Sequence, residues 1–232
     1  MKNNEEYKII KLISDPNCKS ILTNELFKFS QEEKEKMKNI IKDIKNDKFK
    51  NTKDKGNALE ELIGILFKSD NFFKVYHNVK TSSNEIDLVV EFLENALLFN
   101  INKIFGISSN KLIIECKNYN KKVDVTWVGK FIHLLNSHNL ETGIIFSKKT
   151  LTGIKNNKLT WNDAAGLVKK FYLKSSKIVI CLTFDDFENI LDEKINFIEL
   201  CKDKISNIQL DTDIFTIEHE NSTKKFEELI VL

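Results

Sequence analysis

Apolar positions along the chain follow two different periods. Over residues 30–44 they recur every three to four positions, the spacing of one helix face, and Ser30 with Glu33 matches a capping box. The helical period returns over residues 57–68, whereas later apolar runs are short and have the length of strands. The pattern therefore predicts an N-terminal helical segment followed by a domain that mixes helices and strands.

The predicted elements come in the order helix, three strands, helix, strand, helix, strand and a last helix, which is typical of an α/β sandwich with a central mixed sheet. Polar residues 45–56 break the helical pattern and predict a linker. Residues 93–107 are interpreted as an insertion, helical in part, that covers the core or meets a partner. We expect strands at 73–79, around Asp87, at 112–117, 143–147 and 177–183, and helices at 126–137, 160–174 and 185–200.

Length and composition fit one main domain. We expect a helical extension over residues 1–55, an α/β domain over 56–205 and a C-terminal segment, 206–232, of uncertain packing. The chain has 232 residues, 41% of them hydrophobic, and no apolar run approaches the ~20 residues of a membrane span. No signal peptide is evident and the four cysteines lack a zinc-type spacing, so we expect a cytoplasmic protein with reduced thiols.

Charge is unevenly distributed, although the net charge is only +2. Residues 111–177 contain thirteen lysines against four acidic residues, and residues 178–232 contain five against thirteen. A basic segment is typical of a phosphate-contacting surface, but solvated helix faces explain it at least as well. All 36 basic residues are lysine, which lacks the bidentate geometry that arginine offers to guanine. We therefore expect contact with a nucleic-acid backbone and weak sequence specificity.

Charged residues occur inside two predicted strands, where desolvation makes them costly unless they are paired. Asp87 lies within one apolar run, and Glu115 and Lys117 end another. Because strand side chains alternate, Glu115 and Lys117 project from one face and Cys116 from the other. Two carboxylates and the carbonyl of Cys116 are suitable Mg²⁺ ligands, and Lys117 would offset charge on a phosphate. A cross-strand salt bridge explains an isolated E-x-K better, but the preceding Asp makes the combination more specific.

Three segments together resemble the PD-(D/E)xK nuclease superfamily, and within it the Mrr-type restriction endonuclease domain. They are G-N-A-L-E at 56–60, E-I-D at 85–87 and I-E-C-K-N at 114–118, within a likeness that covers about residues 55–185. The resemblance implies a restriction-endonuclease-like αβββαβ core. It also implies that Asp87 and Glu115 bind the metal, that Lys117 completes the site, and that Glu60 is an auxiliary acid with Glu61 as its rival.

Two features depart from the family pattern. The proline that usually accompanies its first motif is replaced by Glu85 and Ile86, and the insertion at 93–107 is longer than a hairpin needs. Trp127 and Phe131 are interpreted as core residues of a helix rather than as a base-stacking surface. No role is assigned to the four histidines.

The resemblance implies a Mg²⁺-dependent DNA endonuclease, with Mn²⁺ able to substitute, acting in restriction or anti-phage defence. Open alternatives are a structure-selective repair or junction nuclease and a catalytically silent DNA-binding scaffold. A homodimer and a partner subunit bound through residues 1–55 or 93–107 also remain open. Contacts with backbone phosphates are expected from Asn118, Lys121, Lys122, Lys130, Lys148 and Lys149.

Overall fold

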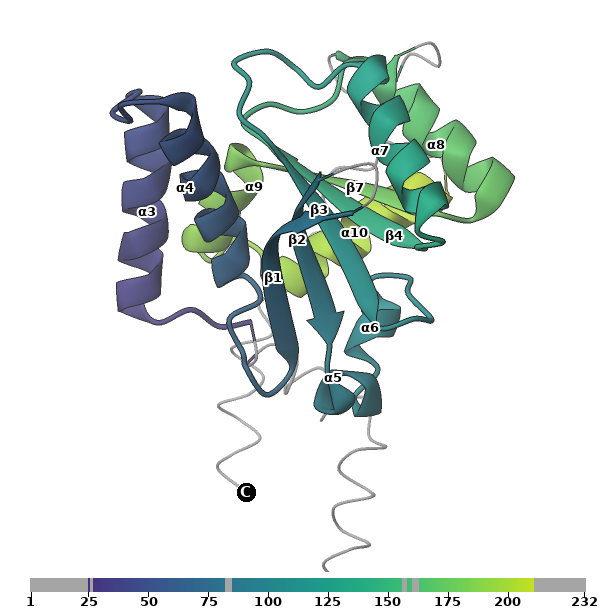
Figure 1. Ribbon diagram of the computed structural model, residues 1–232, viewed down its shortest axis with the longest axis horizontal. Coiled ribbons are helices and arrows are strands. Elements are labelled where there is room, and N and C mark those ends of the chain that lie inside the picture. The colour runs from purple at the N-terminus through teal and green to yellow at the C-terminus, as the bar shows by residue number, and fades with distance from the viewer. Residues whose placement is uncertain (1–24, 26, 82–84, 156–157, 160–162, 211–232) are drawn as a thin grey trace, which may run out of the picture.

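A five-stranded mixed sheet forms the centre of the protein in the computed structural model, which describes residues 25, 27–81, 85–155, 158–159 and 163–210 (Figure 1). The strand order is β1-β2-β3-β4-β7; β1 to β3 are antiparallel, and β3, β4 and β7 are parallel. The predicted αβββαβ order and the mixed sheet are confirmed. The strands are β1 (Phe73–Lys80), β2 (Glu85–Phe92), β3 (Lys111–Lys117), β4 (Thr142–Ser147) and β7 (Ile178–Thr183).

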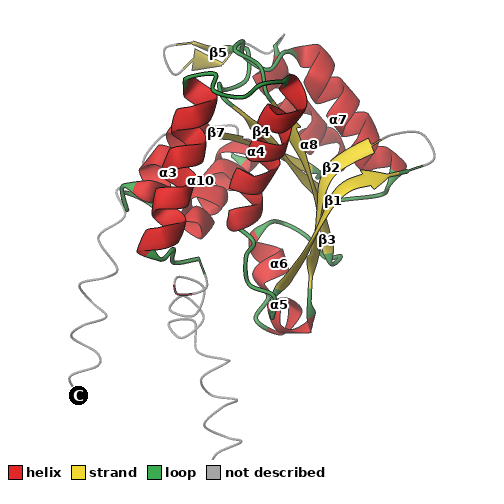
Figure 2. Cartoon of the chain, turned by 60° about the vertical axis from the view of Figure 1, so that its left-hand side comes forward, coloured by secondary structure: helices red, strands yellow, loops and turns green. Residues whose placement is uncertain are grey.

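Helices cover both faces of the sheet and produce two hydrophobic cores (Figures 1 and 2). One face carries α3 (Gln31–Lys45), α4 (Thr52–Ile65), α9 (Phe184–Leu191) and α10 (Phe197–Gln209). The other carries α7 (Val125–Ser137) and α8 (Ala164–Ser175), and a two-stranded ribbon, β5 (Ile154–Lys155) with β6 (Lys158–Leu159), precedes α8. Within the described part of the chain, no helix is both long and apolar enough to cross a membrane.

The N-terminal boundary of α3 is as predicted, because Ser30 and Glu33 form a reciprocal capping box. Met37, Ile41 and Ile44 of α3 are buried in the same core as α4. The expected linker over 45–56 is too long, since α4 already begins at Thr52. Its exposed first turn is polar, and the Asn51 side chain caps it by accepting a hydrogen bond from the backbone of Asp54 at 2.8 Å.

Two other predicted helices need correction. The helix expected from residue 160 begins at Ala164, with Asp163 as its N-cap residue, and position 160 lies outside the described residues. The single helix expected over 185–200 is two helices, α9 and α10. A left-handed backbone at Glu193 (φ 57°) ends the first one, and the Asn196 side chain caps the second through the backbone of Glu199 at 3.0 Å.

The insertion at 93–107 contains two short helices, α5 (Glu94–Leu98) and α6 (Ile101–Ile104), as expected. Ala96, Ile101 and Phe105 are buried in the core shared with α4, so the insertion closes one end of that core. It joins the end of β2 to the start of β3, whereas Asp87 and Glu115 lie toward the other end of these strands (Figure 1). The insertion therefore lies away from the predicted site.

Helix α7 approaches the sheet closely at Gly143 of β4. A Cβ added at this glycine would lie 2.5 Å from Cζ of Phe131, which is itself buried in α7. The interpretation of Phe131 as a core residue is confirmed. Because α7 starts soon after β3, this contact also helps to set where the beginning of the helix lies relative to the predicted site.

We expect Gly143→Ala to lower the free energy of unfolding by about 1–3 kcal/mol, because the added methyl overpacks against Phe131. Gly129→Ala in α7 is the matched control, since its added Cβ would meet no described atom within 4 Å. That control should gain about 0.5–1 kcal/mol from its higher helix propensity. Urea unfolding of both variants measures the difference, and equal effects would contradict the close approach.

Candidate active site

The predicted site residues gather where β2 and β3 stop pairing. The register of β2 with β3 ends at Leu88 and Ile114. Beyond it, Oδ2 of Asp87 accepts a hydrogen bond from the backbone N–H of Cys116 at 2.6 Å, in place of a further backbone rung. β3 remains paired with β4 as far as Lys117, opposite Ser147. This forked end of the sheet places a carboxylate of β2 against the charged end of β3.

The ribbon of β1 and β2 turns over at this fork. Val75 packs with the core on the α4 side of the sheet, whereas Val79 packs with the core on the α7 side. Asn78, between them, has a left-handed backbone with φ 50°. Residues from both faces of the sheet can therefore meet near Asp87.

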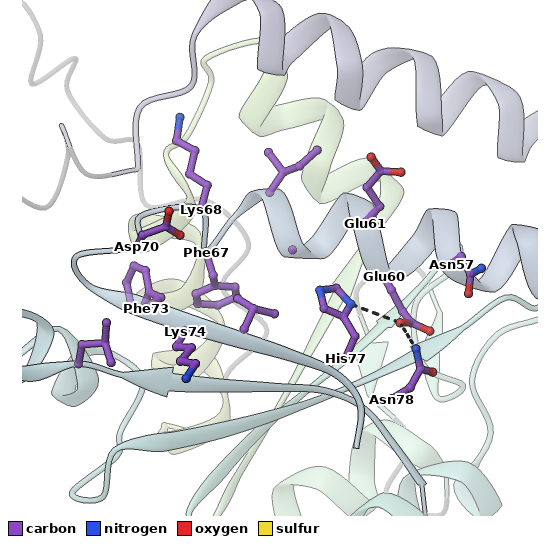
Figure 3. A pocket seen from close by; sticks show the side chains of 14 residues that line it. Asn57, Glu60, Glu61, Phe67, Lys68, Asp70, Phe73, Lys74, His77 and Asn78 are labelled. Atoms are coloured by element: carbon purple, nitrogen blue, oxygen red, sulfur yellow. Dashed lines mark hydrogen bonds and ion pairs between the residues drawn. The ribbon is translucent and has the colours of Figure 1, made fainter. Parts of the chain in front are cut away.

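Glu60 reaches the fork from α4. Its Oε2 accepts a hydrogen bond from Nδ2 of Asn78 at 3.2 Å and lies 3.5 Å from Nδ1 of His77 (Figure 3). Glu60 is buried, whereas its rival Glu61 is exposed and pairs with Lys36 of α3 at 2.7 Å. Of the two acids, Glu60 is the one directed toward the fork, at the end of an open groove of about 880 Å³ between α4 and β1.

Glu115 and Lys117 form an ion pair at the end of β3, with only 17% and 13% of their side chains exposed. Nζ of Lys117 also lies 4.0 Å from the ring centroid of Trp127, on whose ring Nζ of Lys130 lies at 4.4 Å. The ring of Tyr119 packs beside that of Trp127, with 5.5 Å between centroids. The position of Lys117 is therefore set by a carboxylate and by an aromatic face.

Trp127 packs against the core on the α7 side of the sheet, as expected, but sequence analysis missed its contact with the lysines near the site. It is only partly buried, and it joins two lysines from different elements. No sequence period relates Lys117 in a strand to Trp127 in the following helix. The contact is visible only once α7 is packed on the sheet.

The positive charge near the carboxyl groups of this site is too small to balance their negative charge. Burial raises the pKa of Asp87, although the Cys116 N–H and the charge of Lys117 oppose that rise. Burial and, next, the charge of Asp87 raise the pKa of both Glu115 and Glu60. Desolvation and, next, the charge of Asp87 raise the pKa of the partly buried Cys116 thiol well above its usual range, so it remains neutral. Lys117, already paired with Glu115, does not offset all three carboxylates.

The donor atoms suit a hard divalent cation. Asp87 uses Oδ2 for the Cys116 N–H, and among the described residues its Oδ1 accepts no hydrogen bond. Within the same residues, no three His, Cys, Asp or Glu side chains converge closely enough to hold a metal by themselves. Mg²⁺ is commonly held by one or two carboxylates with water and substrate phosphate completing its octahedron, which Asp87 and Glu115 would permit. The nearby Oδ1 of Asn118 is buried and accepts no hydrogen bond from any residue that the structure describes.

The residues expected to contact DNA lie mainly after the ends of β3 and β4, with Lys130 on α7, and several of them contact neighbouring residues. Lys122 donates to the carbonyl of Ile154 at 2.7 Å, and Lys148 donates to Oδ1 of Asn120 at 2.9 Å. Lys130 stacks on Trp127. Lys121 and Lys149 are exposed. Lys121 and Lys149 are therefore directly accessible, and the other lysines are partly committed to neighbours.

Comparison with known proteins gives one match. Residues 53–154 match the family model Mrr_cat, described as a restriction endonuclease. No curated protein and no solved structure matches the chain at a significant level. The matched segment includes α4, β1 to β3, α7 and β4, and so contains all of Glu60, Asp87, Glu115 and Lys117.

We expect Asp87→Asn to stabilise the metal-free protein at pH 7 by about 1 kcal/mol. The amide keeps an oxygen for the Cys116 N–H but removes the charge that raises the pKa of Glu60 and Glu115. Carboxyl groups with raised folded-state pKa favour folding below their ordinary pKa, and this contribution is lost as pH rises through the raised values. The gain should therefore shrink between pH 7 and pH 4. Urea unfolding in EDTA at pH 7 and pH 4 measures the free energy of unfolding of both proteins, with Asp70→Asn at an exposed position as the control. A stabilisation by Asp87→Asn that grows toward pH 4 would contradict the prediction.

Proposed function

We propose that the protein is a divalent-metal-dependent nuclease that hydrolyses phosphodiester bonds within DNA, a proposal supported by the match of residues 53–154 to a restriction-endonuclease family model. The observation that carries the proposal is the meeting of Asp87, Glu115 and Lys117 at the forked end of the sheet. The two carboxylates carry more negative charge than Lys117 offsets. A divalent cation would supply the missing positive charge, and a substrate phosphate would pair with that cation.

Asp87 and Glu115 would hold the metal, with the carbonyl of Cys116 as a further ligand. Mg²⁺ is the expected ion, and Mn²⁺ should replace it because both prefer oxygen ligands. When bound, the metal supplies an activated water and charge stabilisation for the phosphate. The Asn118 Oδ1, buried and without a described partner, suits the acceptance of a hydrogen bond from a water or ligand at the same place.

Lys117 would act on the transferring phosphate. Its ammonium is held between Glu115 and the Trp127 ring, so it is oriented before substrate arrives. If Glu115 served as a metal ligand, its ion pair with Lys117 would weaken. The ammonium would then be available to a phosphate oxygen or to the attacking water, while Trp127 continues to position it.

Glu60 would serve as an auxiliary acceptor. It is fixed by Asn78 and His77 through Oε2, and its raised pKa suits a group that takes a proton from water. The substrate side is supported by the lysines that follow β3 and β4, which would contact phosphates without reading bases. A single site cuts one strand, so cleavage of both strands in restriction or anti-phage defence would need a dimer or two successive visits.

Plasmid nicking tests the assignment. We expect nicking with Mg²⁺ or Mn²⁺, none in EDTA, and a loss of at least about a hundredfold in rate for Lys117→Gln or Asp87→Ala, because each removes charge stabilisation of the transition state. Lys202→Gln on α10 changes the same charge on an exposed helix face and should nick as fast as the wild type.

Equal rates for Lys117→Gln and the wild type would remove Lys117 from the reaction. Duplex binding without nicking under any metal condition, together with no Mg²⁺ binding by calorimetry, would favour the silent scaffold. Preferential cutting of branched over linear DNA would favour the junction or repair nuclease.

Trp127 should position Lys117 rather than bind DNA. We expect Trp127→Leu to lower kcat for nicking about tenfold with little change in KM, since a partly desolvated cation–π contact is worth about 0.5–2 kcal/mol. Trp127→Phe keeps an aromatic face and should recover most of the rate. A rise in KM with unchanged kcat in the leucine variant would instead identify Trp127 as a DNA contact.

A further inference from the structure

A second group of charged side chains lies at the start of α4. Lys55, near the N-terminal end of this helix, lies close enough to Lys148, which directly follows β4, for the two side chains to influence each other's charge. Lys55 also forms an ion pair with Asp47, and Lys148 donates to Oδ1 of Asn120 at 2.9 Å. Burial and the charge of Lys55 lower the pKa of Lys148 to about 8. Two amines held together with one carboxylate leave an excess of positive charge that an anion would relieve.

This pair of lysines borders the proposed active site. Ser147 pairs with Lys117 in the last pair of the β3–β4 ladder, so Lys148 is the first residue beyond this ladder. Lys55 precedes Glu60 on the same helix by five positions, a rise of about 7–8 Å along its axis. A nucleic-acid strand lying across the forked end of the sheet would bring a neighbouring phosphate to this place.

Asp47 occupies a position that local structure disfavours. It follows the C-cap of α3 in a left-handed conformation with φ 54°, where glycine or asparagine is usual. A carboxylate at this end of a helix also opposes the helix dipole. The Asp47 side chain is 77% exposed, whereas that of Lys55 is only 13% exposed. The presence of an aspartate at position 47 is therefore better explained by its ion pair with Lys55 than by a contribution to the stability of α3.

We propose that Lys55 and Lys148 form a binding site for an internal backbone phosphate of DNA, and that Asp47 is the counter-anion that this phosphate displaces. The inference rests on the proposed function for its ligand, but Lys55 and Asp47 lie outside the catalytic groups. Because Asp47 is largely exposed, it can move into solvent at little cost when a phosphate takes its place. The loop between α3 and α4 thus restrains DNA binding until a suitably placed phosphate arrives.

The test measures binding of the full chain to a short labelled duplex by fluorescence anisotropy in EDTA, from about 50 to about 200 mM salt. Asp47→Asn, which suits a left-handed position, should bind about twofold to fivefold more tightly. Lys55→Gln and Lys148→Gln should each bind more weakly and reduce the slope of log affinity against log salt by about 0.9. In the Lys55→Gln background, Asp47→Asn should have no further effect.

Lys202→Gln is the charge-matched control and should leave both affinity and slope unchanged. Unchanged affinity in Asp47→Asn, or a Lys55→Gln slope equal to that of the control, would overturn the inference. The duplex is used with 5′-phosphate and with 5′-hydroxyl ends, and a Lys55 effect confined to the former would overturn the assignment to an internal phosphate.

The two proposals fail in different ways. A wild-type protein that neither binds nor nicks DNA contradicts the proposed function. A wild-type protein that does both, with Lys55 and Asp47 variants that bind like the control, contradicts only the phosphate site.

Discussion

The hydrogen bond between Asp87 and the backbone of Cys116 is the contact on which the proposed active site depends. It satisfies a donor that lost its strand partner when β2 and β3 stopped pairing, and it draws a carboxylate toward the end of β3. Glu115 and Lys117 are thereby faced by a second acid, and Glu60 approaches from α4. The desolvation that raises the pKa of these acids is the same property that would favour capture of a cation.

Much of this arrangement follows from the sequence because its signals are local. Alternation within β3 is sufficient to place Glu115 and Lys117 on one face, and the Ser30–Glu33 pair is sufficient to start α3. The order of helices and strands along the chain and the mixed sheet were predicted from the succession of apolar runs. The boundaries that failed, at Thr52 and at Glu193, depend on caps and a left-handed residue within polar stretches, where apolar periodicity carries no information.

Contacts between distant segments could not be predicted. Helical spacing correctly placed Trp127 against the core, but it could not predict that Lys117 of the preceding strand lies over the Trp127 ring. Glu60 and Glu61 differ only in which neighbour each meets, Asn78 of β1 or Lys36 of α3. The proximity of Lys55 to Lys148 involves positions nearly a hundred apart, and so depends on the complete fold.

The location of β1 has a further consequence. Among the strands that the structure describes, it is an edge strand whose single neighbour is β2, and most of its side chains are at least partly solvent-accessible. Edge elements of this kind open by local fluctuation at lower free energy than the central strands. Since His77 and Asn78 of β1 hold Glu60, fraying of this strand would release the acid while the two cores remain folded. Local release of Glu60 should then precede global melting, and any binding partner that adds a strand alongside β1 would stabilise the proposed active site.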